Sequence, residues 1–388
     1  MTDKLALVLS GGGARGAFEV GVLRWLARER PEFFKQVRIV TGSSVGAINA
    51  AYLASHGMTP DSVESLARIW ENLKVGELIG FGPRHVLGRL TKWRQRLVDG
   101  QVPGQGWLRT EGYENLIIDA VDWGRLNRVV KEGTLDAVAI AATEVRSGRT
   151  HIFVSHHEEV RAPIWPFDGS MIGLRTPIGP EHVLASASLP FLFSPVEING
   201  HWFCDGGLRQ NTPLSPALRL GANRLLAVSL KKTSVDAIPG STEFPGFGQL
   251  LGKLFNSLFL DRLLWDLDRL SRINTLLACV EELHGKGAIP SLQNELVKRG
   301  RRPYQHVDYV GVRPSADIGK IAADMLKPPH QLHTELGFLM RRVLGTGSSG
   351  VSDAASYLLF DGAFAKRLMD LGGQDAANCA TDIDRLLT

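Results

Sequence analysis

The sequence predicts a three-layer α/β fold in which a mostly parallel sheet is sandwiched between helices. Two strand-to-helix turns near the N-terminus carry this prediction: the apolar run 5–9 leads into a glycine-rich loop at 10–16, and the run 37–41 leads into a tight turn at 42–46. A helical pattern of apolar residues follows each turn. Short, wholly apolar strands that alternate with helices are typical of a parallel sheet buried on both faces.

The other elements are expected in order along the chain. The first helix ends at Pro31, a second covers 45–56, and a third starts after Thr59-Pro60-Asp61. Asn199-Gly200 predicts the turn of a hairpin, because such a pair adopts the backbone of a two-residue turn. The sequence further predicts strands at 135–143, 150–154, 224–230 and 306–312, helices at 181–188 and 214–220, and hairpin strands within 197–203.

We expect a main domain over 1–323 and a helical segment over 324–388. The main domain carries a mainly helical insertion at about 232–300, which begins with a linker rich in proline, serine and glycine. A leucine stripe at 247–270 is more typical of a core or an oligomer contact than of a lipid-docking lid, and it allows a homo-oligomer. Helices are expected over 317–388, with interruptions at Gly345–Gly350 and Gly372-Gly373.

Composition and charge limit the classes of partner. The chain is 44% hydrophobic and 22% charged with a net charge of +4, which suits an anionic membrane surface but is far too small to indicate nucleic acid. Its three cysteines are widely separated, which indicates a reducing compartment and no metal cluster. No apolar run is long enough to cross a membrane, so we expect a cytoplasmic protein with peripheral membrane contact.

A basic segment at 84–97 interleaves arginine and lysine with leucine and tryptophan. A helix of this composition can lie on lipid headgroups. A solvated helix face is the simpler interpretation, because charged runs on insertions usually face water.

The turn at 42–46 has the G-x-S-x-G pattern of a nucleophile elbow. Glycine is needed at Gly42 and Gly46 because a side chain there would collide with the neighbouring strand or helix. Ser44 then stands at the apex, with the positive end of the following helix beneath its hydroxyl. The sequence therefore nominates Ser44 as a nucleophile, although this pattern also occurs in plain strand-to-helix turns.

The glycine-rich loop has two possible uses, because its backbone amides suit negative charge. Gly11, Gly13 and Gly16 fit the spacing of a dinucleotide site, but no acidic strand end follows at the required distance and there is no Walker lysine. The same amides can instead form an oxyanion hole for a carbonyl attacked by Ser44. The nearby elbow favours the oxyanion hole.

Asp205-Gly206-Gly207 follows the second hairpin strand. An aspartate at a strand end beside two glycines can reach a site without steric shielding. Taken alone, an Asp-Gly turn is the simpler interpretation.

Together these motifs resemble the patatin-like phospholipase family. The matching stretches are 11–16, 42–46 and 205–207, and Ala185-Ser186-Ala187-Ser188-Leu189-Pro190 also fits the family pattern. The resemblance covers about residues 4–231 and extends to the strand near 306–312. It does not extend to the insertion or to the C-terminal helices.

The resemblance implies a serine acyl-ester hydrolase with a Ser-Asp dyad, which cleaves phospholipids or related lipid esters through an acyl-enzyme without a metal or cofactor. Its implied substrate is a lipid or membrane surface, and nucleic acid is not an implied partner. The site residues it implies are Ser44 as nucleophile, Asp205 as proton acceptor, Gly11, Gly12, Gly13 and Arg15 at the oxyanion hole, and Gly42, Gly46, Gly206 and Gly207 as supporting glycines.

Two alternatives remain open at this point. A Ser-His-Asp esterase would need a late histidine, for which His306, His330 and His333 are candidates, but it would give the 205–207 motif no role. A catalytically silent lipid- or nucleotide-binding module would not need Ser44, Asp205 and the glycine-rich loop together.

Overall fold

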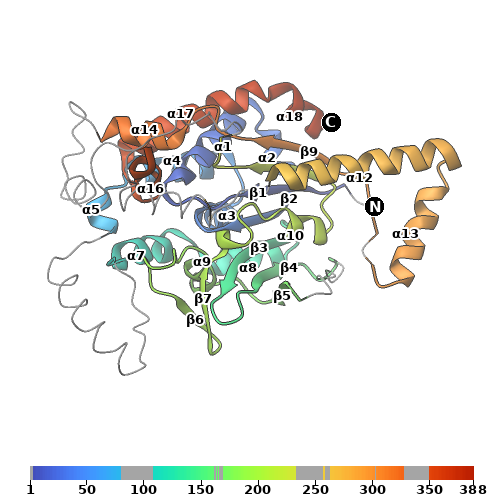
Figure 1. The fold of residues 1–388 in the computed structure, drawn as a ribbon, viewed down its shortest axis with the longest axis horizontal. Helices are drawn as coiled ribbons and strands as arrows, with labels where there is room; N and C mark the ends of the chain where they lie inside the picture. The colour runs from blue at the N-terminus through green and yellow to red at the C-terminus, as the bar shows by residue number, and fades with distance from the viewer. Residues whose placement is uncertain are drawn as a thin grey trace, which may run out of the picture.

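The computed structural model describes residues 3–79, 108–160, 169–232, 263–301, 303–326 and 349–388, together with Pro163, Trp165 and Ser257. A mostly parallel sheet with the strand order β5-β4-β3-β2-β1-β8-β9 lies between helices (Figure 1). This arrangement confirms the predicted fold class. The strands are β1 (Leu5–Leu9), β2 (Val37–Ser43), β3 (Ala137–Glu144), β4 (Thr150–His156), β5 (Met171–Arg175), β6 (Val196–Ile198), β7 (His201–Asp205), β8 (Arg224–Val228) and β9 (Asp308–Val312).

The central strand β1 explains why the first apolar run has no polar position. Its Leu5, Leu7 and Leu9 point into one hydrophobic cluster, whereas Ala6 and Val8 point into a second cluster on the other face. Strands β2 and β8 pair with β1 in parallel on either side. Because both faces of the strand are covered, every one of its residues is apolar.

Helices form the outer two layers. The second cluster is closed by α10 (Leu214–Arg219) and by the first turns of α12 (Leu263–His284), and α12 then runs out to α13 (Ala288–Lys298) beyond the sheet (Figure 1). The larger cluster is covered by α1 (Ala17–Glu29), α2 (Glu32–Gln36), α3 (Val45–His56), α4 (Pro60–Glu71), α5 (Val75–Leu78), α7 (Glu111–Ala120), α8 (Trp123–Lys131), α9 (Pro180–Ser186), α14 (Ile318–Met325), α16 (Ser349–Leu358), α17 (Gly362–Asn378) and α18 (Ala380–Leu387).

Local signals place several elements correctly. Helix α4 is present as predicted, but it begins at Pro60 instead of after Asp61, and Thr59 caps it. Strands β6 and β7 form the predicted hairpin, in which Asn199 and Gly200 have φ values of 52° and 79°. The leucine stripe of the insertion is described only from Leu263 onward, and there its buried residues join the second cluster. The basic segment 84–97 lies outside the described residues.

The predicted interruption at Gly372-Gly373 is wrong, because both glycines lie inside α17. They serve the packing of α17 on α1. A Cβ on Gly372 would stand 2.2 Å from the Phe18 carbonyl oxygen, and a Cβ on Gly21 would stand 2.1 Å from the Met369 carbonyl oxygen. These glycines therefore bring the two helix backbones together instead of ending a helix.

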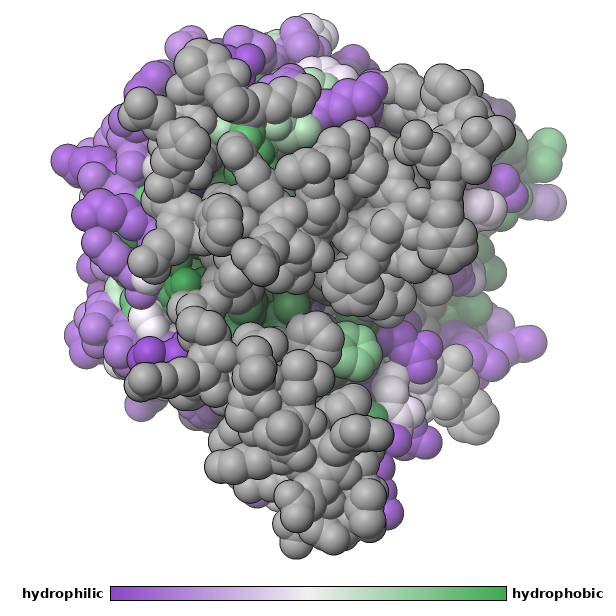
Figure 2. All heavy atoms as spheres, turned by 60° about the vertical axis from the view of Figure 1, so that its left-hand side comes forward, coloured by the Kyte–Doolittle hydropathy of each residue, from purple (hydrophilic) through white to green (hydrophobic). Residues whose placement is uncertain are grey.

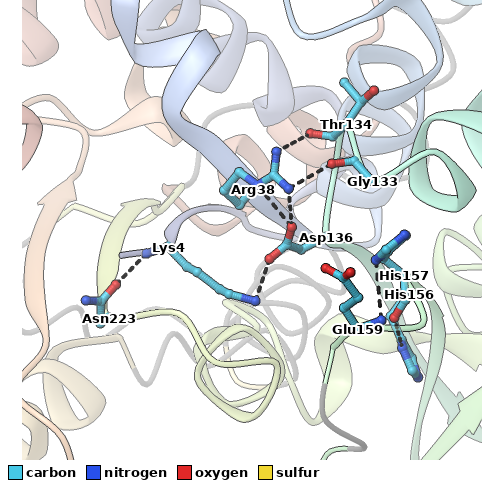
Figure 3. A network of polar contacts seen from close by, with 9 residues as sticks. All are labelled: Lys4, Arg38, Gly133, Thr134, Asp136, His156, His157, Glu159 and Asn223. Atoms are coloured by element: carbon cyan, nitrogen blue, oxygen red, sulfur yellow. Dashed lines mark hydrogen bonds and ion pairs between the residues drawn. The ribbon is translucent and has the colours of Figure 1, made fainter. Parts of the chain in front are cut away.

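Charged groups close the amino-terminal edge of the sheet (Figure 3). Asp136 lies just before β3. Its Oδ2 forms a salt bridge with Lys4 Nζ at 2.5 Å, and its Oδ1 accepts a hydrogen bond from Arg38 Nε at 3.0 Å. The Lys4 amide donates to Asn223 Oδ1 at 2.7 Å, just before β8. In sheets of parallel strands, functional sites usually lie at the opposite edge, where the strands end. None of the described helices combines the length and hydrophobicity needed to span a membrane.

The helix contact generates a paired prediction. Gly372→Ala should lower the free energy of unfolding by about 1–3 kcal/mol, because its methyl group would overlap a backbone oxygen. Gly373→Ala should raise it by up to about 1 kcal/mol, because its nearest neighbour would be 3.8 Å away and alanine favours helix. Urea unfolding of both variants measures the difference, and equal effects would contradict the packing argument.

Candidate active site

Ser44 lies at the sharp turn between β2 and α3. Its φ of 52° and ψ of −125° are unusual for a residue with a side chain. The flanking glycines allow this turn, because a Cβ on Gly42 would stand 2.4 Å from the Gly46 carbonyl oxygen, and a Cβ on Gly46 would stand 2.5 Å from Leu9 backbone atoms. The local sequence thus builds an elbow that presents a single side chain at its apex.

Asp205 ends β7 and meets the apex directly. Ser44 Oγ donates to Asp205 Oδ2 at 2.5 Å, and the Gly207 amide donates to Asp205 Oδ1 at 2.7 Å. Ser44 is 2% exposed and Asp205 is fully buried. Gly206 is required for close approach, because its Cβ would stand 2.0 Å from the Ala141 carbonyl oxygen. The fold brings these two predicted residues into direct contact.

Burial controls the protonation of Asp205. Removal from water raises the pKa of its carboxyl to about 7, against the opposing effect of the hydrogen bonds from Ser44 and Gly207. A carboxylate is a better proton acceptor when its pKa is raised, and a base works best when its pKa lies near the working pH. Asp205 is therefore suited to exchange a proton with a hydroxyl near neutrality.

The glycine-rich loop lies against Ser44. A Cβ on Gly11 would stand 3.0 Å from Ser44 Cβ, so this residue must be glycine for the loop to pass. The Gly11 amide donates to the Asn211 carbonyl oxygen at 2.9 Å. Within the described part of the chain, the amides of Gly12 and Gly13 have no hydrogen-bond acceptor. These two amides are the donors of the loop that an oxyanion could use.

Arg15 is held by the C-terminal part of the chain. Its Nε donates to Ser356 Oγ at 2.8 Å, and its guanidinium carbon lies 4.0 Å from the centre of the Tyr357 ring. Gly13, with a φ of 57°, leaves room for the Tyr357 carbonyl oxygen, which would stand 2.2 Å from a Cβ. The described contacts of Arg15 therefore tie the glycine-rich loop to α16.

Ser186 is a site residue whose role the sequence did not reveal. The Ser44 amide donates to Ser186 Oγ at 2.8 Å, and Ser186 Oγ donates to the Ala141 carbonyl oxygen at 2.6 Å. The Asp205 amide donates to the Ser188 carbonyl oxygen at 2.9 Å. The 185–190 stretch thus holds the backbone of both dyad residues, and its match to the family pattern was the available signal.

A second buried carboxyl lies beneath the loop and was also missed. Glu19 accepts hydrogen bonds from the Ser10 amide at 2.6 Å and from Asn49 Nδ2 at 2.9 Å. Asn49 in turn accepts from Trp70 Nε1 at 3.1 Å. Burial raises the pKa of Glu19 to about 8, although both hydrogen bonds oppose the shift. Glu19 links the start of the glycine-rich loop to the elbow helix α3.

An apolar cavity of about 40 Å³ lies between α3, α4 and α7, lined only by apolar atoms. Val45, which follows Ser44, lines one side, and Tyr113 on α7 lines another. Burial raises the pKa of the Tyr113 phenol, and the charge of Asp205 adds to this shift, so the ring lies within electrostatic range of the dyad. Among the described residues, Figure 2 shows hydrophobic side chains on the face that lies at the left in Figure 1.

The histidine candidates do not form a triad among the described residues. His306 is exposed just before β9, where its Nε2 lies 3.1 Å from Asp308. His330 and His333 lie outside the described residues. The hydrogen-bond partner that the structure gives the Ser44 hydroxyl is a carboxylate.

Comparison with known proteins gives a consistent family. The sequence model described as patatin-like phospholipase matches residues 7–218. A patatin-like phospholipase domain-containing protein of Caenorhabditis elegans is 27% identical over 227 residues, covering 58% of this chain and 13% of that protein. An uncharacterized NTE family protein of Mycobacterium tuberculosis is 24% identical over 245 residues, covering 62% of this chain and 54% of that protein. The chain thus spans only part of the length of either relative.

Solved structures are more distant. Human GIVD cytosolic phospholipase A2 aligns with a TM-score of 0.45 at 12% identity, covering 99% of this chain and 60% of that one. VipD from Legionella pneumophila aligns with a TM-score of 0.34 at 14% identity, covering 95% of this chain and 67% of that one.

The buried carboxyl generates a prediction about stability and pH. Asp205→Asn should keep both hydrogen bonds, because the carboxamide can accept from Gly207 and donate to Ser44. In the wild type, burial raises the pKa from 3.8 to about 7, so the stability contribution of Asp205 is fully present below the lower value and is lost as pH rises through the higher one. The melting temperature of the variant, relative to that of the wild type, should therefore increase as the pH is raised from about 4 to about 8. A difference that stays constant across this window would contradict a raised pKa.

Proposed function

Because the chain belongs to the patatin-like phospholipase family, we propose that it hydrolyses acyl esters of phospholipids or related lipids through an acyl-Ser44 intermediate. The hydrogen bond of 2.5 Å between Ser44 Oγ and the buried Asp205 carboxylate carries this proposal. A serine hydroxyl is a weak nucleophile unless a neighbouring group accepts its proton. The pKa of about 7 lets Asp205 accept that proton near neutral pH.

In the first step Ser44 Oγ attacks the ester carbonyl carbon, and its proton passes to Asp205. The charge that develops on the carbonyl oxygen is stabilised by the amides of Gly12 and Gly13, since the Gly11 amide already donates to Asn211. Loss of one such donor typically costs about 10²- to 10³-fold in rate. Asp205 then returns the proton to the leaving alcohol, which departs and leaves the acyl-enzyme. Water releases the acid in a second step.

The apolar lining of this small cavity supports an apolar group of the substrate. Only apolar atoms face the cavity, and Val45, the residue after Ser44, is part of its lining. Burial of an acyl chain contributes about 0.8 kcal/mol per CH₂, whereas a polar substituent placed there would lose its hydrogen bonds to water. We propose peripheral contact with a lipid surface as the way in which such a substrate is reached.

Reaction with an active-site fluorophosphonate tests the activated serine. Intact mass should show one adduct on the wild type, none on Ser44→Ala, and an unchanged adduct on the matched control His333→Ala. Absence of an adduct on the wild type would favour the catalytically silent module, and loss of it in His333→Ala would favour a Ser-His-Asp esterase.

A second prediction concerns pH and the base. With a p-nitrophenyl ester, kcat/KM of the wild type should rise with pH and level off with an apparent pKa of about 7, because only ionised Asp205 accepts the proton. Asp205→Asn should lower kcat/KM by about 10²- to 10⁴-fold on the plateau above about pH 8, where Asp205 of the wild type is ionised. A pH profile that is flat from about pH 5 to 9 would remove Asp205 as the base.

A further inference from the structure

Asn211 lies where the segment that follows Asp205 crosses the glycine-rich loop. Its backbone oxygen accepts from the Gly11 amide at 2.9 Å. The next residue, Thr212, shares a hydrogen bond of 2.7 Å between its hydroxyl and that of Ser10. These contacts hold the backbone of Asn211 in place without any help from its side chain.

Unlike the backbone oxygen, the side-chain oxygen of Asn211 has no hydrogen-bond partner among the described residues. The residue is 6% exposed, and its Oδ1 is buried. Oδ1 lies 2.7 Å from the position that a Cβ on Gly11 would occupy, and Ser44 Cβ lies 3.0 Å from the same position. The unpaired oxygen and the Cβ atom of Ser44 therefore both pack close to Gly11, which places the Asn211 side chain beside Ser44.

A buried carbonyl oxygen without a donor is unfavourable, so its presence at a site points to a donor supplied by a reactant. The reacting ester group carries no O–H or N–H. Water, the reactant of the second step, carries two O–H groups. An oxygen that accepts one of them can orient the water while the other proton is transferred.

We propose that Asn211 Oδ1 binds and orients the water that hydrolyses acyl-Ser44, an inference that rests on the proposed function. The water oxygen attacks the acyl carbon while one of its protons passes to Asp205 and the other is held by Asn211. The tetrahedral intermediate then breaks its bond to Ser44 Oγ, which takes the proton back from Asp205, and the carboxylic acid leaves. Asn211 thereby acts in deacylation and is not needed for acylation.

The opposite orientation of the carboxamide makes a different prediction. If its NH₂ group faced the ester, Asn211 would be a third oxyanion donor. Both steps pass through an oxyanion, so both would then depend on this residue. The separate rates of acylation and deacylation distinguish the two roles.

The experiment compares the wild type with Asn211→Ala and Asn211→Leu, and Gln210→Ala is the control from the same segment. Leucine matches the size of asparagine and removes the polar atoms, so it tests the oxygen without opening a cavity. Rapid mixing with p-nitrophenyl octanoate gives the acylation rate from the burst and the deacylation rate from the steady state. Fluorophosphonate labelling shows that each variant is folded at Ser44.

We expect both Asn211 variants to acylate within about threefold of the wild-type rate and to deacylate at least about tenfold more slowly, as loss of positioning predicts. Intact mass after acid quench should then show octanoyl-Ser44 accumulating in these variants and not in Gln210→Ala. Equal loss in both steps, or no loss in either, would overturn the role in deacylation. Failure of the wild type to acylate would instead overturn the proposed function.

Discussion

The hydrogen bond between Ser44 and Asp205 joins residues 161 positions apart, and the sheet is what fixes its length. Strand β3 pairs on one side with both of the strands that lead to these residues, because β4 occupies its other side. It pairs in parallel with β2, where Ala141 is opposite Ser43, and antiparallel with the end of β7, where Ala142 is opposite Asp205. Adjacent residues of β3 therefore set the positions of Ser44 and Asp205. A shift of register in either pairing would separate the dyad.

Small residues around β3 let the two strand ends approach. A side chain at Gly206 would overlap the Ala141 carbonyl oxygen, and one at Gly42 would overlap the Gly46 backbone. The space they leave is too tight for bulk water, and this burial raises the pKa of Asp205. Close packing and base strength thus have a common cause, because the glycines that permit contact also exclude solvent from the carboxylate.

The sequence predicts those turns and strands that are determined by residues adjacent along the chain. The elbow at Ser44, the hairpin turn at Asn199-Gly200 and the wholly apolar strand β1 are local patterns, and the structure contains all three. The contacts of Arg15 with α16 bridge 341 positions, and no local pattern encodes such a contact. The prediction that Gly372 interrupts a helix is wrong for the same reason, because a glycine that ends a helix and one that packs against another helix look alike in sequence.

The two edges of the sheet treat buried aspartates differently. At the amino-terminal edge Asp136 forms ion pairs with Lys4 and Arg38. At the carboxyl edge Asp205 receives only a hydroxyl and an amide among the described residues, and no cation is among the causes of its pKa shift. A cation in contact with Asp205 would lower its pKa and weaken it as a base. Within the described part of the chain, an aspartate at one edge of the sheet therefore has compensating charges, and the aspartate at the other edge has only neutral hydrogen-bond donors.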